Sequence, residues 1–535
     1  MTEATPWWFG SVGYQAYIRS FADHSGSGTG DLRGIRDRLE HLEWLGVDAV
    51  WINPFNPSPG HDHGYDVSDY VDVDPRHGTL ADFDDLVAEA QRRDIRVIVD
   101  IVPNHTSHEH DWFKAAVADP TGPYRDYYIW RDPAPDGGPP NNWVSHFGGP
   151  AWTFEPNSGQ YYCHTFLSEQ PDLEWRNPAV ADEFEEILRF WLDRGASGFR
   201  IDVAHGCSKD LELRDNPQIR PIDDTMSPRA VFDSYDHLHD LDQDENVDIY
   251  RRWNQIAAEY DAVLIGEIGA DKVDRASRYV TGGDALHQLF YLRSTWAEWN
   301  PEDWREMVTS MQAITQTGVS WALSCHDRPR PVTRFMSDGV DLVRSRERSF
   351  TMTTLFMALG GMPFLYQGEE LGLADGDVDP SSISDPLAAR HLEFADEGRD
   401  GCRTPMPWDS SENNGFTTGI PWLLSEPRPV AETVEAQRDD ITSMVHRYRA
   451  LVAFRHATPA LWEGDSTAVD LGPDIIAIQR PDSLAVTNLA ADPRRVELPA
   501  GTWQLGFSSA AGAASGHVSG TIGIDGETSH LYVRV

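Results

Sequence analysis

Short apolar segments alternate with longer amphipathic segments through most of this chain. The segment at 96–102 is almost continuously apolar, as expected of a parallel strand that is covered on both faces. The segment at 32–45 has the helical spacing Leu32, Ile35, Leu39, Leu42 and Leu45. The pattern predicts eight strands, each followed by a helix, which together form a (β/α)8 TIM barrel. The predicted strands are 14–19, 49–52, 96–102, 198–202, 262–267, 285–290, 320–323 and 363–366.

The alternation fails in two places, and this predicts the domain organisation. From 104 to 176 the chain is rich in Pro, Gly, Trp and Tyr, and it is too long for a loop, which predicts an inserted subdomain after strand 3. From 459 to 535 short strands separated by turns predict a C-terminal antiparallel β domain. The barrel then comprises 1–103 and 177–458, with predicted helices at 302–316 and 439–456 and a long loop at 367–438.

The composition narrows the class of partner. The 535 residues carry 44 Lys and Arg against 86 Asp and Glu, a formal charge of -42, which repels nucleic acid and anionic membranes and suits a neutral small molecule. No apolar run is long enough to span a membrane, and residues 1–8 do not read as a signal peptide. The four cysteines are scattered, which favours reduced thiols and a cytoplasmic enzyme. The oligomeric state stays open.

Polar side chains gather where the predicted strands end. Arg200 and Asp202 lie on the same face of one strand, where the guanidinium holds the carboxylate ionised. Taken alone, this pair is equally consistent with a structural ion pair. The carboxyl ends of barrel strands form one active-site face, so a joint site explains the whole set better. The set comprises Asp62, Tyr65, Asp100, His105, Arg200, Asp202, Glu267, His326 and Asp327.

Several chemistries lack their usual motifs. No HExxH segment, no GxGxxG after a strand and no GxxxxGK[ST] motif is present, which disfavours a catalytic zinc and a nucleotide cofactor. Paired carboxylates with many Trp and Tyr suit a sugar. Asp202 would attack the anomeric carbon and Glu267 would protonate the leaving oxygen, the retaining mechanism with carboxylates roughly 5 Å apart. Asp327 would raise the pKa of Glu267 through like-charge repulsion.

Four motifs resemble those of the α-amylase superfamily, glycoside hydrolase family 13. They are the segments 100–105 (DIVPNH), 198–202 (GFRID), 266–267 (GE) and 326–327 (HD). The segments 170–173, 366–371 and 403–408 resemble the α-glucosidase and oligo-1,6-glucosidase branch. The resemblance implies that Asp202 is the nucleophile, Glu267 the acid/base and Asp327 the transition-state stabiliser. It further implies an exo-acting pocket for one terminal glucose, lined by Asp62, Tyr65, His105, Arg200, His326 and Arg403.

The same resemblance implies a binding site for a structural cation. The loop at 23–31 is similar to the branch's divalent-cation loop, which implies Asp23, Ser25, Ser27 and Asp31 as ligands of Ca²⁺ or Mg²⁺; no cofactor is required for catalysis. Two of the four are hydroxyls, which are weaker ligands for a hard cation than the usual Asp or Asn.

Substrate preference depends on weaker signals. Val203 follows the nucleophile, as in relatives that act on α-1,6 bonds, but the next residues, 204–206, do not match that group. We expect short α-1,4-linked substrates such as maltose, with transglucosylation to alcohols. A sucrose or maltose isomerase and an α-glucosyltransferase are alternatives on the same site. A non-catalytic sugar-binding or scaffold protein is a remote alternative, because non-catalytic members of the superfamily lose the three carboxylates that are present here.

Overall fold

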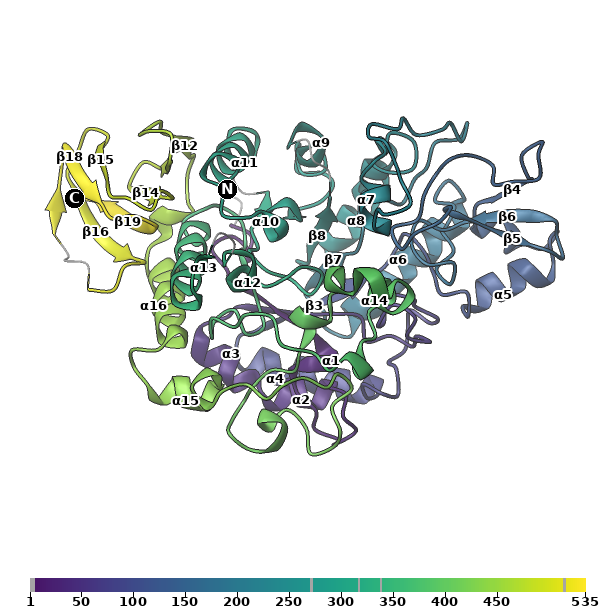
Figure 1. Ribbon diagram of the computed structural model, residues 1–535, viewed down its shortest axis with the longest axis horizontal. Coiled ribbons are helices and arrows are strands. Elements are labelled where there is room, and N and C mark those ends of the chain that lie inside the picture. The colour runs from purple at the N-terminus through teal and green to yellow at the C-terminus, as the bar shows by residue number, and fades with distance from the viewer. Residues whose placement is uncertain (1–4, 270–272, 316–317, 337–338, 513–515) are drawn as a thin grey trace.

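Eight parallel strands form the centre of the molecule in a computed structural model that describes residues 5–269, 273–315, 318–336, 339–512 and 516–535 (Figure 1). The spatial order is β10-β9-β8-β7-β3-β2-β1-β11, and a parallel bridge from Ala322 to Phe364 brings the outer strands together. The predicted barrel is therefore confirmed, in a nearly closed form. Its strands are β1 Gly13–Ala16, β2 Ala49–Ile52, β3 Arg96–Ile101, β7 Gly198–Ile201, β8 Val263–Ile268, β9 Gln288–Tyr291, β10 Val319–Ser320 and β11 Phe364–Tyr366.

Helices surround these strands and begin where the sequence provides caps. Thr79 and Asp82 form a capping box at the start of α4, and Asn177 caps α6, whose first residue is Pro178. The helices are α1 Ile18–Phe21, α2 Leu32–Asp37, α3 Leu39–Leu45, α4 Leu80–Arg92, α5 Asp111–Ala118, α6 Pro178–Asp193, α7 Pro228–Phe232, α8 Asn246–Glu259, α9 Val273–Ser277, α10 Arg293–Trp296, α11 Pro301–Ile314, α12 Pro331–Arg334, α13 Leu342–Phe356, α14 Pro386–Arg390, α15 Val434–Asp439 and α16 Met444–Ala457.

Several predicted elements differ in detail from the structure. The strand predicted at 14–19 is β1, which ends at Ala16, and the helix α1 begins at Ile18. The strand predicted at 285–290 is β9, which begins at Gln288. The single helix predicted at 32–45 is two helices, because the backbone at Arg38 has φ -106° and ψ 3° and interrupts the helical turn between α2 and α3. The strand predicted at 320–323 is β10, which ends at Ser320, although Trp321 to Leu323 are buried. A short apolar run therefore marks burial here without marking a strand. The helix predicted at 302–316 is α11, which ends at Ile314, and residue 316 lies outside the described residues. Residues 1–4, part of the segment 1–8 considered as a signal peptide, also lie outside them.

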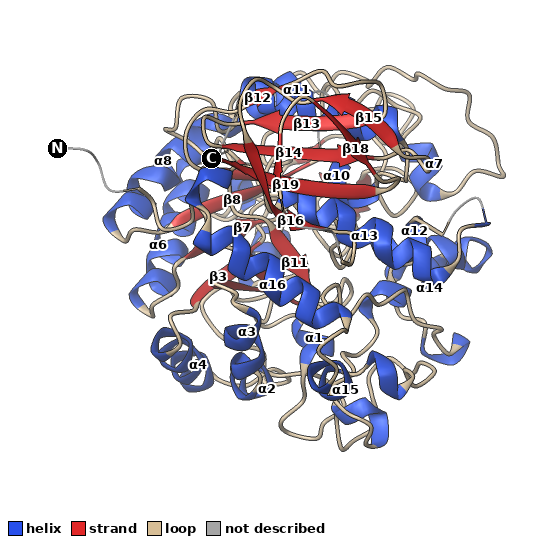
Figure 2. Cartoon of the chain, turned by 90° about the vertical axis from the view of Figure 1, so that its left-hand side faces the viewer, coloured by secondary structure: helices blue, strands red, loops and turns tan. Residues whose placement is uncertain are grey.

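Antiparallel sheets lie at opposite ends of the molecule (Figure 1), and Figure 2 views it from the end that carries the C-terminal strands. Between β3 and α6, the strands β4 Trp130–Arg131, β5 Trp152–Glu155 and β6 Gln160–Cys163 pair in the order β4-β6-β5. After α16, a six-stranded sheet has the order β12-β13-β14-β19-β16-β17, and β15 pairs with β18. The C-terminal strands are β12 Thr467–Ala468, β13 Ile475–Gln479, β14 Ser483–Asn488, β15 Arg494–Glu497, β16 Trp503–Ser508, β17 His517–Val518, β18 Thr521–Ile524 and β19 Thr528–Arg534.

A buried lysine joins the segment after β3 to the segment after β7. Lys209 Nζ donates to Asn104 Oδ1 at 3.1 Å and to Thr165 Oγ1 at 2.9 Å, and it lies 3.2 Å from Asp172 Oδ2. Both charged side chains are almost completely buried. This cluster fixes the inserted segment against the strand ends that carry the site. None of the helices in the described ranges has the length and apolar character needed to cross a bilayer.

Candidate active site

A cavity of about 640 Å³ opens at the carboxyl ends of the barrel strands. Six of the predicted site residues line it: Asp62, Tyr65, His105, Asp202, Glu267 and Asp327. The other four are at most 2% exposed: Arg200, His326 and Arg403 contact carboxylates that line the cavity, and Asp100 pairs with Arg200. A cavity of this volume suits a small ligand rather than a polymer. The inner end of the cavity is polar.

Arg200 connects the carboxylates of three neighbouring strands. Its Nη1 donates to Asp202 Oδ1 at 2.7 Å and to Asp100 Oδ1 at 3.1 Å, and its Nη2 lies 2.7 Å from Glu267 Oε1. The contact follows from the register, because β3 pairs with β7 and β7 pairs with β8 in parallel. The guanidinium also lies over the ring of Trp51, 4.8 Å from its centroid. The predicted Arg200–Asp202 pair is present, and it is part of a larger cluster.

Burial dominates the titration of this cluster. It raises the pKa of Asp202, with Arg200 opposing the rise and Glu267 and Asp100 reinforcing it. It also raises the pKa of Glu267, where Arg200 again opposes and the charge of Asp327 adds to the rise. The pKa of Asp100 rises to about 7 for the same reason. Three carboxylates share one guanidinium, and burial together with their mutual repulsion favours protonation within the cluster.

Val203 holds an unusual backbone conformation between the two central carboxylates. Its φ is +42°, in the left-handed region that β-branched residues rarely adopt. In this conformation its N–H donates to Glu267 Oε2 at 2.9 Å, and the residue also lines the cavity. The residue after Asp202 therefore orients the carboxylate of Glu267 through its backbone.

Asp327 is surrounded by cations. Its Oδ1 accepts from Arg399 at 3.0 Å and from Arg403 at 2.9 Å, and its Oδ2 lies 3.3 Å from His326 Nε2. Burial would raise the pKa of Asp327, but His326, Arg399 and Arg403 hold it well below its usual range. Burial also lowers the pKa of His326, so the imidazole is neutral and the two guanidinium groups account for the effect. The surrounding cations therefore favour the ionised form of Asp327.

His326 and Tyr65 form the floor beside this carboxylate. The imidazole is stacked between Tyr17 and Tyr65, with ring centroids 5.5 and 5.3 Å apart, and its Nδ1 lies 2.8 Å from Gln15 Nε2. The hydroxyl of Tyr65 donates to Asp100 Oδ2 at 3.0 Å. These contacts fix both rings; Tyr65 lines the cavity, and the buried His326 supports it from behind.

Asp62 and His105 lie on the opposite wall and share one amide. Gln170 Nε2 donates to Asp62 Oδ2 at 3.2 Å and lies 3.0 Å from His105 Nε2. Asp62 Oδ1 accepts from Arg399 at 2.9 Å. Burial lowers the pKa of His105. This wall therefore offers both hydrogen-bond donors and acceptors to the cavity.

Sequence reasoning missed two residues of the site. Arg399 contacts Asp62, Asp327 and Asp385 simultaneously, and Asp385 has a completely buried side chain. Both belong to the long loop after β11, which has no hydrophobic periodicity that could place them. Arg403, which belongs to the predicted motif at 403–408, lies four residues from Arg399. This closeness in sequence is the one feature that could have indicated Arg399 as a site residue.

The predicted cation loop does not fit a metal site. Asp23 accepts hydrogen bonds from the hydroxyls of Ser25 and Thr417 and from two backbone N–H groups of the loop. Asp31 caps α2 and accepts from Ser25 N at 3.0 Å, while the hydroxyl of Ser27 donates to a carbonyl. The carboxylates thus face donors, which occupy the lone pairs that a cation needs. Across the described ranges, no group of three or more His, Cys, Asp or Glu side chains is arranged to hold a metal ion.

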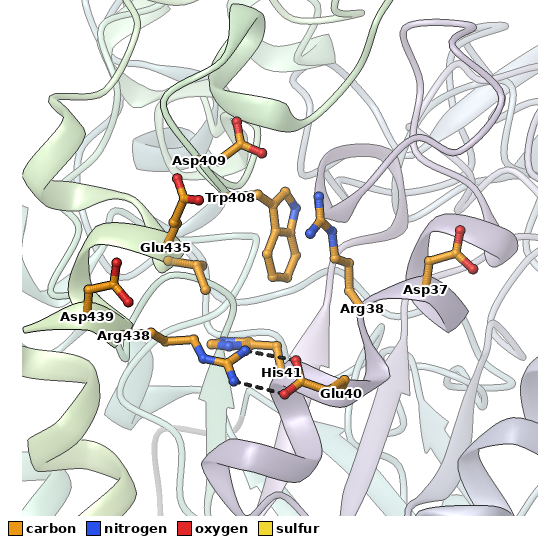
Figure 3. Close-up of a pocket in the computed structure, with 10 residues that line it drawn as sticks. Asp37, Arg38, Glu40, His41, Trp408, Asp409, Glu435, Arg438 and Asp439 are labelled. Carbon is orange, nitrogen blue, oxygen red and sulfur yellow. Dashed lines mark hydrogen bonds and ion pairs between the residues drawn. The ribbon is translucent and has the colours of Figure 1, made fainter.

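A second cavity, of about 400 Å³, lies away from the strand ends (Figure 3). Side chains of α2, α3 and α15 and of the segment near Trp408 surround it. Arg438 pairs with Glu40 at 2.8 Å, and the guanidinium of Arg38 lies 4.4 Å from the ring centroid of Trp408. The barrel carboxylates have no part in this cavity.

Known proteins resemble this chain over nearly its whole length. The family model described as the α-amylase catalytic domain matches residues 15–464. A probable α-glucosidase of Rhizobium meliloti (strain 1021) is 39% identical over 506 residues, which covers 92% of this chain and 91% of that protein. The crystal structure of an α-glucosyl transfer enzyme matches with a TM-score of 0.91 and 38% identity, covering 99% of this chain and 100% of the other. The trehalulose synthase of Pseudomonas mesoacidophila MX-45 matches with a TM-score of 0.86 and 33% identity, with the same coverage.

Proposed function

The chain belongs to the α-amylase catalytic-domain family and is a glycoside hydrolase, and from this premise we propose that it is a retaining, exo-acting α-glucosidase. It would release α-glucose from the non-reducing end of short α-glucosides, with maltose-type substrates preferred. One observation carries the proposal: Asp202, Glu267 and Asp327 line one cavity, and Arg200 binds the first two. The cavity volume of about 640 Å³ supports an action on small substrates.

In the first step, Glu267 gives its proton to the glycosidic oxygen while a carboxylate oxygen of Asp202 attacks the anomeric carbon. The bond from that carbon to the leaving oxygen breaks, and a covalent glucosyl ester forms on Asp202. Arg200 orients Asp202 and opposes the rise in the pKa of Asp202 that burial causes. The raised pKa of Glu267 favours its protonated form before attack.

In the second step, water attacks the anomeric carbon and gives a proton to Glu267, and the ester bond to Asp202 breaks. Two inversions at the same carbon retain the α configuration. Asp327 accepts hydrogen bonds from sugar hydroxyls, and these strengthen as positive charge develops on the ring. An alcohol in place of water would give transglucosylation by the same bond changes.

Substrate and product analysis tests the proposal. Maltose, isomaltose, nigerose, kojibiose, sucrose and trehalose are incubated separately, and free glucose is followed against disaccharide products. We expect glucose as the main product from maltose. With methyl α-glucoside, whose leaving group is not a sugar, we expect α-glucose as the first glucose anomer seen by proton NMR. Initial release of β-glucose would contradict the retaining mechanism.

The similarity to a trehalulose synthase makes an isomerase the second candidate. Isomeric disaccharides that exceed free glucose at modest sucrose concentration would support it over a hydrolase.

The variant Glu267→Gln should lose about 10³-fold in kcat on maltose, because general acid catalysis contributes about 10² to 10⁴. Full activity of this variant would exclude the role given to Glu267.

A further inference from the structure

We propose that the cavity between α3 and α15, away from the strand ends, binds one neutral polyhydroxylated molecule of the size of a single sugar (Figure 3). Its volume of about 400 Å³ lies within the range of about 300–1,000 Å³ that is usual for small-molecule sites. Among the described residues, none lines both this cavity and the catalytic one, so the inference does not depend on the proposed function.

His41 lies at the base of this cavity and has a ring nitrogen without a partner. The side chain is 2% exposed, and Figure 3 shows its ring below the indole of Trp408. Its Nε2 lies 3.3 Å from Oε1 of the buried Glu370, which places the proton of the neutral ring on Nε2 and leaves Nδ1 as an acceptor. No described residue forms a hydrogen bond with Nδ1. Because buried polar atoms are nearly always hydrogen-bonded, this nitrogen indicates that the cavity receives a hydrogen-bond donor.

The wall formed by α15 and the segment near Trp408 offers further acceptors. Glu435 and Asp439 line the cavity, and their carboxylates accept no hydrogen bond from the described residues. Asp409 accepts from the backbone N–H and the hydroxyl of Ser411 at Oδ1 alone, which leaves Oδ2 unused within the described parts of the chain. This wall therefore favours a ligand with several hydrogen-bond donors.

Arg38 supplies donors from the opposite wall, where the chain passes from α2 to α3. Its guanidinium lies over the ring of Trp408, 4.4 Å from the centroid, and its one acceptor among the described residues is the carbonyl of Gly415, at 3.5 Å. A guanidinium carries five N–H groups, so most of these donors face no described acceptor. The ligand must therefore accept hydrogen bonds as well as donate them.

An ion pair across the cavity holds its two walls together. Arg438 of α15 donates to both carboxylate oxygens of Glu40 on α3, each at 2.8 Å (Figure 3). The buried Val434 adds an apolar surface on which the C–H groups of a sugar can lie. The site is thus formed before the ligand binds, which reduces the cost of ordering its walls.

The mixture of charges in the lining selects a neutral ligand. The carboxylates would repel an anion, and the guanidinium groups of Arg38 and Arg438 would repel a cation. Hydroxyl groups both donate and accept, so one sugar can donate to His41 Nδ1 and Glu435 and accept from Arg38. Glucose, which the proposed function would release, is one such molecule. The lining carboxylates are Asp37, Glu40, Asp409, Glu435 and Asp439.

Fluorine NMR of the full chain labelled with fluorotryptophan tests the inference at the cavity itself. Trp408 lines this cavity and Trp296 lines the catalytic cavity, so their signals, assigned through Trp408→Phe and Trp296→Phe, report the two sites separately. We expect glucose to shift the Trp408 signal along a saturable curve with its own dissociation constant. Diaminobutane and succinate, a cation and an anion of comparable size, should leave this signal unchanged.

Matched variants localise the binding. Glu435→Ala removes an exposed carboxylate, and His41→Gln keeps an N–H donor for Glu370 while it removes the Nδ1 acceptor. Each should raise the dissociation constant of glucose at the Trp408 signal about fivefold or more, as expected for the loss of one hydrogen bond, and leave the Trp296 curve unchanged. Glu412→Ala removes an exposed carboxylate that is not among the described residues lining the cavity, and it should change neither curve.

Three results would overturn the inference. The first is a Trp408 signal that glucose does not move, and the second is a signal that moves with diaminobutane or succinate but not with glucose. The third is a Trp408 curve that coincides with the Trp296 curve in every variant, because it would report the catalytic cavity alone. Failure of the proposed function would instead appear as no release of glucose from maltose, and it leaves this binding test unaffected.

Discussion

Replacing Arg399 by methionine should lower both the stability and the activity of the enzyme. The guanidinium donates to Asp327 at 3.0 Å and to Asp62 at 2.9 Å, and it is paired with Asp385. Methionine keeps much of the apolar length of the side chain but removes the charge, so the loss reports the ion pairs rather than packing.

The size of the loss in stability depends on the hydrogen bonds and ion pairs that each carboxylate keeps after Arg399 is replaced. Asp327 keeps Arg403 at 2.9 Å, and Asp62 keeps Gln170 at 3.2 Å. Asp385, with a side chain 0% exposed, keeps the backbone N–H groups of Leu387 and Ala388 on one oxygen, and its nearest remaining cation is the guanidinium of Arg403 at 4.0 Å. Removing one partner of a buried pair costs about 3–5 kcal/mol, and we expect about 3 kcal/mol here, mostly from Asp385. With an unfolding entropy of roughly 1.1 kcal/mol/K for 535 residues, Tm should fall by about 3 °C.

Calorimetry and kinetics on three variants check this reasoning. Arg399→Met should lower Tm by about 3 °C and kcat/KM on maltose at least tenfold, because Asp62 and Asp327 lose their shared anchor. Arg390→Met, on the neighbouring α14, removes a surface pair with Glu169 and should change Tm by less than about 1 °C. Adding Asp385→Asn to Arg399→Met should recover at least half of the lost stability. The reasoning is refuted if the double variant is no more stable than Arg399→Met alone.

Three further outcomes are expected. Asp327→Asn removes a negative charge that raises the pKa of Glu267, so the alkaline limb of the kcat/KM profile should move to lower pH; a limb that stays fixed or moves to higher pH contradicts this coupling. Lys209→Met leaves the buried Asp172 without its cation and should cost about 3–5 kcal/mol, measured as a fall in Tm that Asp172→Asn partly reverses; an unchanged Tm would show that the pair is dispensable. Dialysis against EDTA should leave Tm within about 1 °C, because Asp23 already accepts hydrogen bonds at both oxygens; a larger fall that Ca²⁺ reverses would establish a cation site.

The site could be predicted from the sequence where strand geometry dictates position. Asp100, Arg200 and Glu267 meet because β3, β7 and β8 are adjacent and parallel, so consecutive strand ends necessarily approach one another. The roles given to Asp202, Glu267 and Asp327 stay predictions until variants are assayed.

Other features depend on tertiary contacts that no local pattern encodes. Arg399 and Asp385 lie in a loop with no periodicity, and only the folded chain brings them to Asp62 and Asp327. The break in the helix at Arg38 and the early end of β10 occur within apolar patterns that fit the longer elements equally well. Burial was predicted correctly there, but hydrogen bonding was not.

The conformation of Val203 has a consequence for how this enzyme can vary. A β-branched residue with φ of +42° is held by its surroundings against its own preference, at a cost on the order of 1–3 kcal/mol. The same residue lines the cavity with its side chain and orients Glu267 with its N–H. Substitutions at this one position therefore act on substrate fit, acid orientation and conformational energy together. A glycine or asparagine would relax the backbone but would remove the valine side chain. Selection for a new substrate at position 203 is therefore coupled to the stability of the fold.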